Sequence, residues 1–211
     1  SFTALGLLHY NYLGKKERAI KLFYKAFELD PSQIEASYKL AEHFTSIGDW
    51  EMADLICKSV TENSKAKRQL SSSYSNIKDK AWPYRVLGCA SMEFKEDVKA
   101  IEYFQSALRM DSSDISSWIG LGEAYMSRGR LEASVKVFTH VIKLQSGVLE
   151  KDVEITPEME QKADWHVVYL LAVALTNMLE FENSIRILTN LLDTNEEQRN
   201  NSCILTLLIE T

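Results

Sequence analysis

Apolar and polar residues follow one another along this chain with the spacing of amphipathic helices. Between Tyr84 and Phe104, and again between Trp118 and Phe138, apolar residues recur every three or four positions and polar residues separate them. This spacing places the apolar residues on one face of a helix, whereas a strand would need strict alternation. Three prolines and eight glycines in 211 residues also favour long helices over tight turns. The pattern therefore predicts an all-α protein.

The helical pattern repeats with a fixed period of 34 residues. In the middle of the chain, this offset pairs Tyr84 with Trp118, Leu87 with Leu121, Gly88 with Gly122, Ala100 with Ser134, and Phe104 with Phe138. Near the N-terminus it pairs Tyr10 with Phe44, Gly14 with Gly48, and Ala19 with Ala53. A period of 20 to 50 residues is typical of solenoids, in which each repeat packs against its neighbours.

At two places, the spacing between equivalent residues of neighbouring repeats is longer than 34 residues. Ala53 and Ala100 are 47 residues apart, which is 34 plus 13, and Ser134 and Ser184 are 50 apart, which is 34 plus 16. We therefore predict inserts at about 66–80 and 149–163. The predicted repeats are then about 1–33, 34–65, 81–114, 115–148 and 165–198, with a partial sixth at 199–211.

The inserts allow two interpretations. The simpler one is a solvated loop or a lengthened helix, because loops that cover nothing vary freely. The alternative is an element that docks a partner, or a phosphorylation site at Ser71 to Ser75. The sequence alone does not decide between them.

The repeated residues resemble the tetratricopeptide repeat. The repeat from Ser116 carries the pattern most completely, as Trp118, Leu121, Gly122, Tyr125, Gly129, Ser134 and Phe138. In the first repeat the glycine is displaced to Gly6, and Thr3 stands at the aromatic start. The resemblance implies a right-handed superhelical solenoid of helical hairpins. It also implies that residues 1–211 form one continuous segment of a longer array.

The glycines in the stretch "WIGLGEAYMSRGR" have two possible roles: they could bind a phosphate, or they could allow two helices to pack closely. A dinucleotide-binding turn needs a strand before the glycines and a third glycine where Tyr125 stands. Instead, "DSSDISSW" precedes them, with Asp114 suited to cap a helix. We predict that Gly122, Gly88 and Ala172 leave room for the second helix of each hairpin.

The net charge and the histidine and cysteine residues argue against several classes of function. A net charge of −6 predicts little direct RNA binding by this segment, because phosphate binding needs clustered lysine and arginine. The four histidines lie one to a predicted helix, without the spacing of metal ligands or of a catalytic base and nucleophile. Cys57, Cys89 and Cys203 fit reduced thiols. We expect no catalytic, cofactor-binding or metal-binding residues, no membrane contact and no enzymatic activity.

In tetratricopeptide proteins, ligands usually contact the first helix of each repeat. Carrying those positions over predicts these partner-binding candidates: Tyr12, Tyr38, Trp82, Arg85, Met92, Ile119, Glu123, Met126, His166 and Tyr169. The positions that would capture a peptide carboxylate hold Ala4 with Leu8 and Tyr38 with Glu42, which argues against a carboxylate clamp. Each aromatic residue could equally pack against its neighbours.

A closer resemblance, strongest over residues 81–138, is to the scaffold subunits of superkiller (Ski) complexes. It is carried by "AWPYRVLGCA" and "AIEYFQSALRMDSSDISSWIGLGEAYMSRGRLEASVKVF". It implies a non-catalytic, cytoplasmic scaffold that holds a DExH-box RNA helicase and WD-repeat propeller subunits. Together with exosome-associated factors, such an assembly degrades mRNA from 3′ to 5′. The alternative is a tetratricopeptide adaptor of the co-chaperone or targeting type, which binds a short peptide or a partner helix in its groove.

Overall fold

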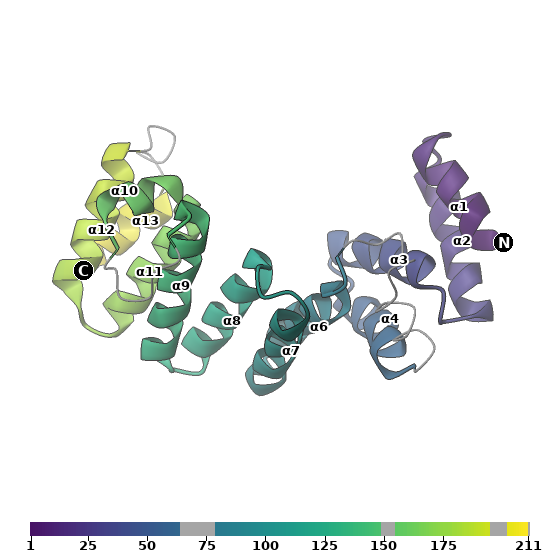
Figure 1. Cartoon of the computed structure of the whole chain (residues 1–211), viewed down its shortest axis with the longest axis horizontal. Coiled ribbons are helices and arrows are strands. Elements are labelled where there is room, and N and C mark those ends of the chain that lie inside the picture. Colours follow the sequence, from purple (N-terminus) through teal and green to yellow (C-terminus); the bar gives the residue numbers. More distant parts are fainter. Residues whose placement is uncertain (64–78, 149–154, 195–201, 211) are drawn as a thin grey trace. The chain divides into compact units, whose positions relative to one another are not determined.

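The computed structural model describes residues 1–63, 79–148, 155–194 and 202–210, and every regular element within them is a helix (Figure 1). The all-α prediction is confirmed. The helices fall into two compact units, Ser1–Asp114 and Ile115–Thr211, which are called unit 1 and unit 2 below. Each unit has its own apolar core.

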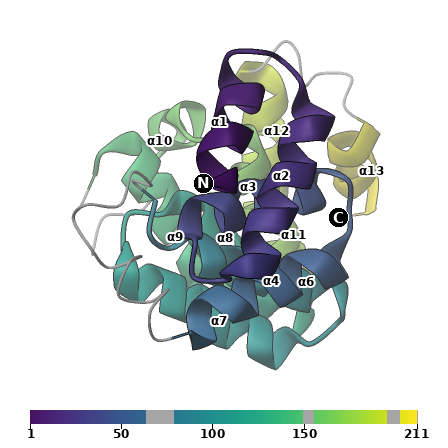
Figure 2. The same cartoon turned by 90° about the vertical axis from the view of Figure 1, so that its right-hand side faces the viewer.

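Unit 1 contains three antiparallel helical hairpins. They are α1 (Phe2–Asn11) with α2 (Lys16–Leu29), α3 (Ile34–Ser46) with α4 (Trp50–Glu62), and α6 (Trp82–Glu93) with α7 (Asp97–Met110). Figure 2 shows α1 and α2 side by side, joined by their turn. Both helices of the α3–α4 hairpin contact a neighbouring hairpin, since α2 packs against α3 and α4 packs against α6. The core of unit 1 is thus shared between hairpins.

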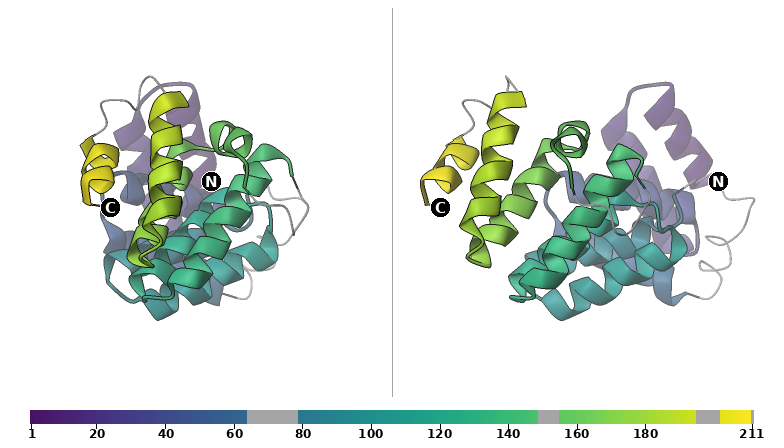
Figure 3. Two further views of the ribbon diagram at one scale, coloured as in Figure 1. Left: turned by 90° about the vertical axis from the view of Figure 1, so that its left-hand side faces the viewer. Right: turned by 60° about the vertical axis from the view of Figure 1, so that its left-hand side comes forward.

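Unit 2 contains two hairpins and two further helices. The hairpins are α8 (Ile115–Ser127) with α9 (Leu131–Ser146), and α11 (Trp165–Asn177) with α12 (Phe181–Thr194). The short α10 (Pro157–Lys162) contacts both α9 and α12, and α13 (Ser202–Glu210) contacts α12 (Figure 3). Helix α11 packs against α9, as α3 packs against α2 in unit 1.

A glycine in the first helix lets the second helix approach in three of the five hairpins. A Cβ atom added to Gly122 would lie 2.5 Å from Phe138 Cε1, and one added to Gly88 would lie 2.6 Å from Phe104 Cε1. Real Cβ contacts do not come this close, so each phenylalanine ring occupies the space that a side chain would fill. The predicted packing role of Gly122 and Gly88 is confirmed.

The other two hairpins keep the same position small but change its partner. Ala41 and Ala172 stand where the glycines are, and the positions facing them hold Cys57 and Leu188 in place of phenylalanine. All four side chains are at most 1% exposed. A larger residue in the first helix is therefore matched by a smaller one in the second.

The turn inside every hairpin uses one residue in the left-handed conformation. The residues are Gly14, Gly48, Lys95, Gly129 and Leu179, with φ between 58° and 76°. In four of the turns, the N–H of the next residue donates to the carbonyl five residues earlier, as Asp49 does to Phe44 at 2.9 Å. This bond satisfies a carbonyl that the helix end leaves free.

The turn of the first hairpin has one additional residue. There the N–H of Lys15 donates to the carbonyl of His9, which is six residues earlier rather than five. Because of the extra residue, each packing position of α1 lies one residue further from the left-handed residue of the turn than in the other hairpins. Gly6 consequently faces Phe23, with a hypothetical Cβ 2.6 Å from Cε1 of the ring. This explains why the glycine of the first repeat is displaced in the sequence.

The second insert is partly a packed helix, unlike the solvated loop of the simpler interpretation. Met159 of α10 is 7% exposed and belongs to the core of unit 2, while Glu160 is 3% exposed. Glu160 accepts a hydrogen bond from Asn190 of α12 at 2.6 Å and pairs with Arg186 at 3.2 Å. The apolar contact and the ion pair explain why α10 docks here. Ser71 to Ser75 of the first insert lie outside the described residues.

We expect Gly122→Ala to lower the unfolding free energy by about 1–3 kcal/mol, because Phe138 is fully buried and its ring cannot yield. Adding Phe138→Leu should recover much of this loss, since the double variant recreates the pair Ala172 and Leu188. Urea unfolding of the wild type, both single variants and the double variant measures the coupling. Additive effects of the two substitutions would contradict the packing described here.

We expect Lys95→Gly and Leu179→Gly each to raise the unfolding free energy by about 0.5–1 kcal/mol, because a left-handed backbone strains a residue with a Cβ atom. The reverse substitution at the same turn position, Gly129→Lys, should lower the unfolding free energy by a similar amount. Shifts in the urea midpoint at constant slope provide the measurement. Equal stabilities of all variants would show that these turns relax without cost.

Candidate functional site

The candidate residues on α3 and α6 of unit 1 form an aromatic contact between two hairpins. The rings of Tyr38 and Trp82 meet edge to face, with centroids 5.3 Å apart and planes at 77°. Trp82 is 1% exposed, so it belongs to the core and offers no surface to a partner. Its assignment as a partner-binding residue is corrected for this reason. Tyr38 is partly exposed over the same core, and Met92 is partly exposed near the end of α6.

Arg85 binds residues of its own unit. Its Nη1 donates to Asp114 Oδ2 at 2.7 Å, and its Nη2 donates to Asp79. Burial opposes the charge of the guanidinium, but the hydrogen bonds of the two carboxylates outweigh it and raise the pKa of Arg85. These bonds tie the segments before α6 and after α7 to α6 itself. The structure thus gives Arg85 an internal role between helices.

Tyr12 lies just after α1, and Tyr10 lies in the last turn of that helix. Tyr12 caps the end of α1 and is 81% exposed, without a partner ring among the described contacts of its unit. Tyr10 stands four residues after Gly6, as Met92 does after Gly88 and Met126 after Gly122. The additional turn residue causes this shift by one position. The position of Gly6 thus aligns Tyr10 with Met92 and Met126, whereas the 34-residue offset aligns Tyr10 with Phe44.

Lys39 connects the aromatic residues of the first two hairpins. Its Nζ lies 4.8 Å from the centroid of Tyr10 and 5.4 Å from that of Tyr38, within the range of cation–π attraction. It also pairs with Glu42 at 2.7 Å. Burial disfavours the ammonium, but the hydrogen bond that it donates to Glu42 and the nearby negative charge prevail, so the pKa of Lys39 is raised. The residue stays cationic beside two aromatic rings.

The candidates of unit 2 lie on α8 and α11. Ile119, Met126 and Tyr169 are partly buried and pack against the core, so each exposes only part of its surface. His166 is exposed in the first turn of α11. Glu123 is half-buried on α8, and burial raises the pKa of its carboxyl while the charge of His166 opposes that shift. The charge of His166 on α11 thus acts on the carboxyl of Glu123 on α8.

Possible metal ligands and cysteine thiols occur in the described parts of the chain. No three histidine, cysteine, aspartate or glutamate residues there stand close enough to hold a metal ion. Burial raises the pKa of the Cys57 thiol well above its usual range, which keeps the thiol protonated. Cys89 is partly exposed and Cys203 exposed. No described helix is both long and apolar enough to span a bilayer.

Comparison with known proteins identifies the hairpins. The family model described as "Tetratricopeptide repeat" matches residues 1–33 and 115–147, which contain the α1–α2 and α8–α9 hairpins. The chain is built of tetratricopeptide repeats. Solved structures agree in fold: YrrB aligns with a TM-score of 0.67 over 97% of this chain and 89% of its own, at 18% identity. MamA aligns with a TM-score of 0.66 over 95% of this chain and 93% of its own, also at 18% identity. The predicted solenoid class is confirmed.

The relatives also confirm the resemblance to superkiller scaffolds. Superkiller protein 3 of Saccharomyces cerevisiae is 40% identical over 144 residues, which cover 68% of this chain and 10% of the yeast protein. Superkiller protein 3 of Schizosaccharomyces pombe is 33% identical over 214 residues, covering the whole chain and 13% of that protein. The chain thus spans about a tenth of the length of the relatives that it matches.

Glu123 makes the stability of unit 2 depend on pH. Its pKa is higher in the folded state than in the unfolded state, so its contribution to stability is complete below the ordinary pKa of glutamate, about 4.3. The contribution is lost as the pH rises through the raised value. We therefore expect that the unfolding free energy of Glu123→Gln does not show this decline with rising pH. In His166→Gln the decline should extend to higher pH, because the charge that opposes the pKa shift of Glu123 is removed.

Urea unfolding from pH 4 to pH 7 measures this dependence in the wild type and in both variants. The unfolding free energy of the wild type should fall relative to that of Glu123→Gln as the pH rises. Parallel curves for the wild type and Glu123→Gln would contradict the buried carboxyl as the cause.

Proposed function

We propose that this chain is part of a non-catalytic scaffold in a Ski-type assembly of the cytoplasm. The scaffold would hold a DExH-box RNA helicase and WD-repeat subunits, and it would support mRNA decay from 3′ to 5′ with exosome-associated factors. The observation that carries this proposal is the similarity to Superkiller protein 3 of Schizosaccharomyces pombe along the whole chain, at 33% identity. A likeness of this extent includes the inserts as well as the repeats.

The physical character of the hairpins supports a scaffold. Their buried residues serve the contacts between helices, such as Phe104 against Gly88 and Tyr38 against Trp82. The repeated use of small and large residues within this chain therefore shapes the fold and does not build a reaction centre. Partly exposed residues of the first helices, including Tyr10, Tyr38 and Tyr169, give large and rigid surfaces suited to protein partners.

An adaptor for a short peptide or a partner helix is the second candidate. One observation favours it: Tyr38 and Met92, on the first helices α3 and α6, are partly exposed and give these helices some apolar surface. An apolar surface of this kind can be covered by an amphipathic helix. The two candidates differ in the kind of complex that they predict, either a stable multi-subunit assembly or a reversible complex with one segment.

We expect the affinity-tagged full-length protein to co-purify stably with a DExH-box helicase and WD-repeat proteins. Gly88→Leu should reduce their recovery, because it separates the helices of the α6–α7 hairpin. Glu102→Gln, an exposed change on α7, is the matched control and should leave recovery unchanged. Mass spectrometry of the eluate identifies the subunits. If no helicase is recovered with the wild-type protein, the scaffold proposal fails.

A further inference from the structure

A hollow lies between the first two hairpins of unit 1, at the edge formed by their turns. The end of α1, the start of α2 and the second half of α3 enclose a volume of about 560 Å³. Tyr10 and Ile20, both partly buried, give it an apolar surface. The space is large enough for one or two side chains of another protein.

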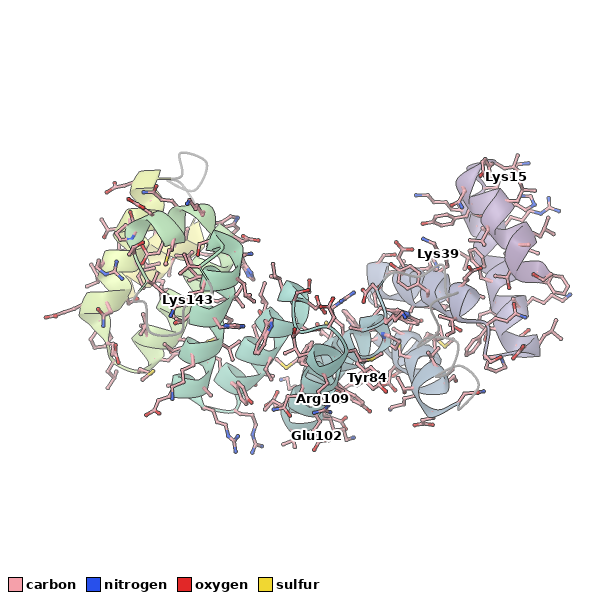
Figure 4. The ribbon with its side chains drawn as sticks, viewed as in Figure 1. Lys15, Lys39, Tyr84, Glu102, Arg109 and Lys143 are labelled. Atoms are coloured by element: carbon pink, nitrogen blue, oxygen red, sulfur yellow. The ribbon has the colours of Figure 1, made fainter. Side chains whose placement is uncertain are left out.

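The hollow is surrounded by positive charge. Lys16 and Lys21 of α2 and Lys39 of α3 line it. Figure 4 shows Lys15 at the turn of the first hairpin, and Lys39 on the side of α3 that faces this hairpin. Between residues 15 and 25 the sequence has the cations Lys15, Lys16, Arg18, Lys21 and Lys25 against the single acid Glu17. The whole chain carries −6, so this is a local reversal of its charge.

Glu42 occupies part of the hollow as an internal counter-ion. Its carboxylate pairs with Lys39 at 2.7 Å, but its side chain is 48% exposed. An ion pair exposed to this extent contributes little to stability. The carboxylate of a partner can therefore compete for Lys39, while Lys16 and Lys21 provide further donors that are exposed.

The corresponding hollow of unit 2 has a different character. It lies between the start of α9 and the end of α11, with a volume of about 500 Å³, and its lining includes Arg130, Glu132 and Met178. One cation and one acid oppose each other there, and its lining contains no lysine. The space therefore recurs with the fold, whereas the cluster of lysines belongs to the first two hairpins.

We propose that the hollow between α1, α2 and α3 binds an acidic segment of a partner protein. An aliphatic or aromatic side chain of the segment lies against Tyr10 and Ile20, and flanking carboxylates pair with Lys16, Lys21 and Lys39. The site is at the turn edge of the hairpins and uses residues of a second helix. The proposal specifies the chemical character of a partner, and it does not depend on which assembly the chain belongs to.

A protein segment fits this surface better than RNA. Glu17 and Glu42 stand among the lysines and would repel a continuous line of phosphates. The apolar part is a hollow with one tyrosine, whereas single-stranded nucleic acid needs a basic track with several stacking rings. A segment whose acidic side chains are separated by apolar ones can place its carboxylates at the lysines, away from the glutamates, while an apolar side chain enters the hollow.

The test uses residues 1–211 and a fluorescein-labelled ten-residue peptide with aspartate and glutamate around a central Leu-Phe pair. We expect fluorescence anisotropy to show saturable binding. Lys16→Glu combined with Lys21→Glu should weaken it about tenfold or more, through loss of two charge pairs. Lys16→Arg with Lys21→Arg should retain it. Glu42→Gln should tighten it about twofold to fivefold, because the internal competitor for Lys39 is removed.

The matched control is Lys99→Glu combined with Lys136→Glu, which changes the net charge equally at exposed positions of α7 and α9. It should leave binding within about twofold, since neither residue lines the hollow. A peptide with serine in place of the Leu-Phe pair should bind more weakly. Equal losses from both charge reversals, or no effect of either, would overturn the proposal.

A single-stranded RNA of equal charge separates the two classes of ligand. We expect it to bind more weakly than the peptide, and submicromolar, salt-sensitive RNA binding that Lys16→Glu and Lys21→Glu abolish would overturn the choice of a protein segment. Circular dichroism of each variant checks that the helices are retained. Because this titration needs no other subunit, its failure is distinct from a failure to co-purify a helicase.

Discussion

The contact between one small residue and one large residue in each hairpin governs the structure. Gly6, Gly88 and Gly122 each receive a fully buried phenylalanine ring, and Ala41 and Ala172 face the smaller Cys57 and Leu188. The sum of the two side chains, more than either alone, sets the distance between the helices. This complementarity fixes the shape of each hairpin, and the shape decides which residues reach the next hairpin.

Hairpins with that shape depend on neighbours to cover their first helices. Leu40, Leu87, Leu121 and Leu171 each precede the small residue of a first helix, and all are at most 4% exposed. Leu5 holds the same position in α1 and is 43% exposed. Since burial of a leucine contributes about 1.5–3 kcal/mol, contacts between adjacent hairpins supply a large part of the stability.

The periodic part of the structure was predictable and the local departures were not. The offset of 34 identified Gly88, Gly122 and their phenylalanines, because these residues recur wherever two helices must approach closely. Trp82 was misassigned because an aromatic residue on a first helix can face either the core or the surface, and the sequence does not record which. Tyr12 stays a candidate at 81% exposure, and the extra turn residue beside it shifts α1 without breaking the 34-residue offset of Gly14. The docking of α10 depends on Glu160 meeting α12, a contact between residues far apart in the sequence.

The difference between the repeated packing residues and the local departures explains where binding specificity can arise in this fold. The space between the helices limits the size of the buried pairs, whereas it sets no such limit on the outer residues of the turns. At the turn edge, the hollow of unit 1 carries Lys16 and Lys21, while that of unit 2 carries Arg130 and Glu132. Both hollows follow from how α2 meets α3 and how α9 meets α11, yet their charges differ. The packing of the helices therefore creates the site, and residues that contribute little to packing determine what it can bind.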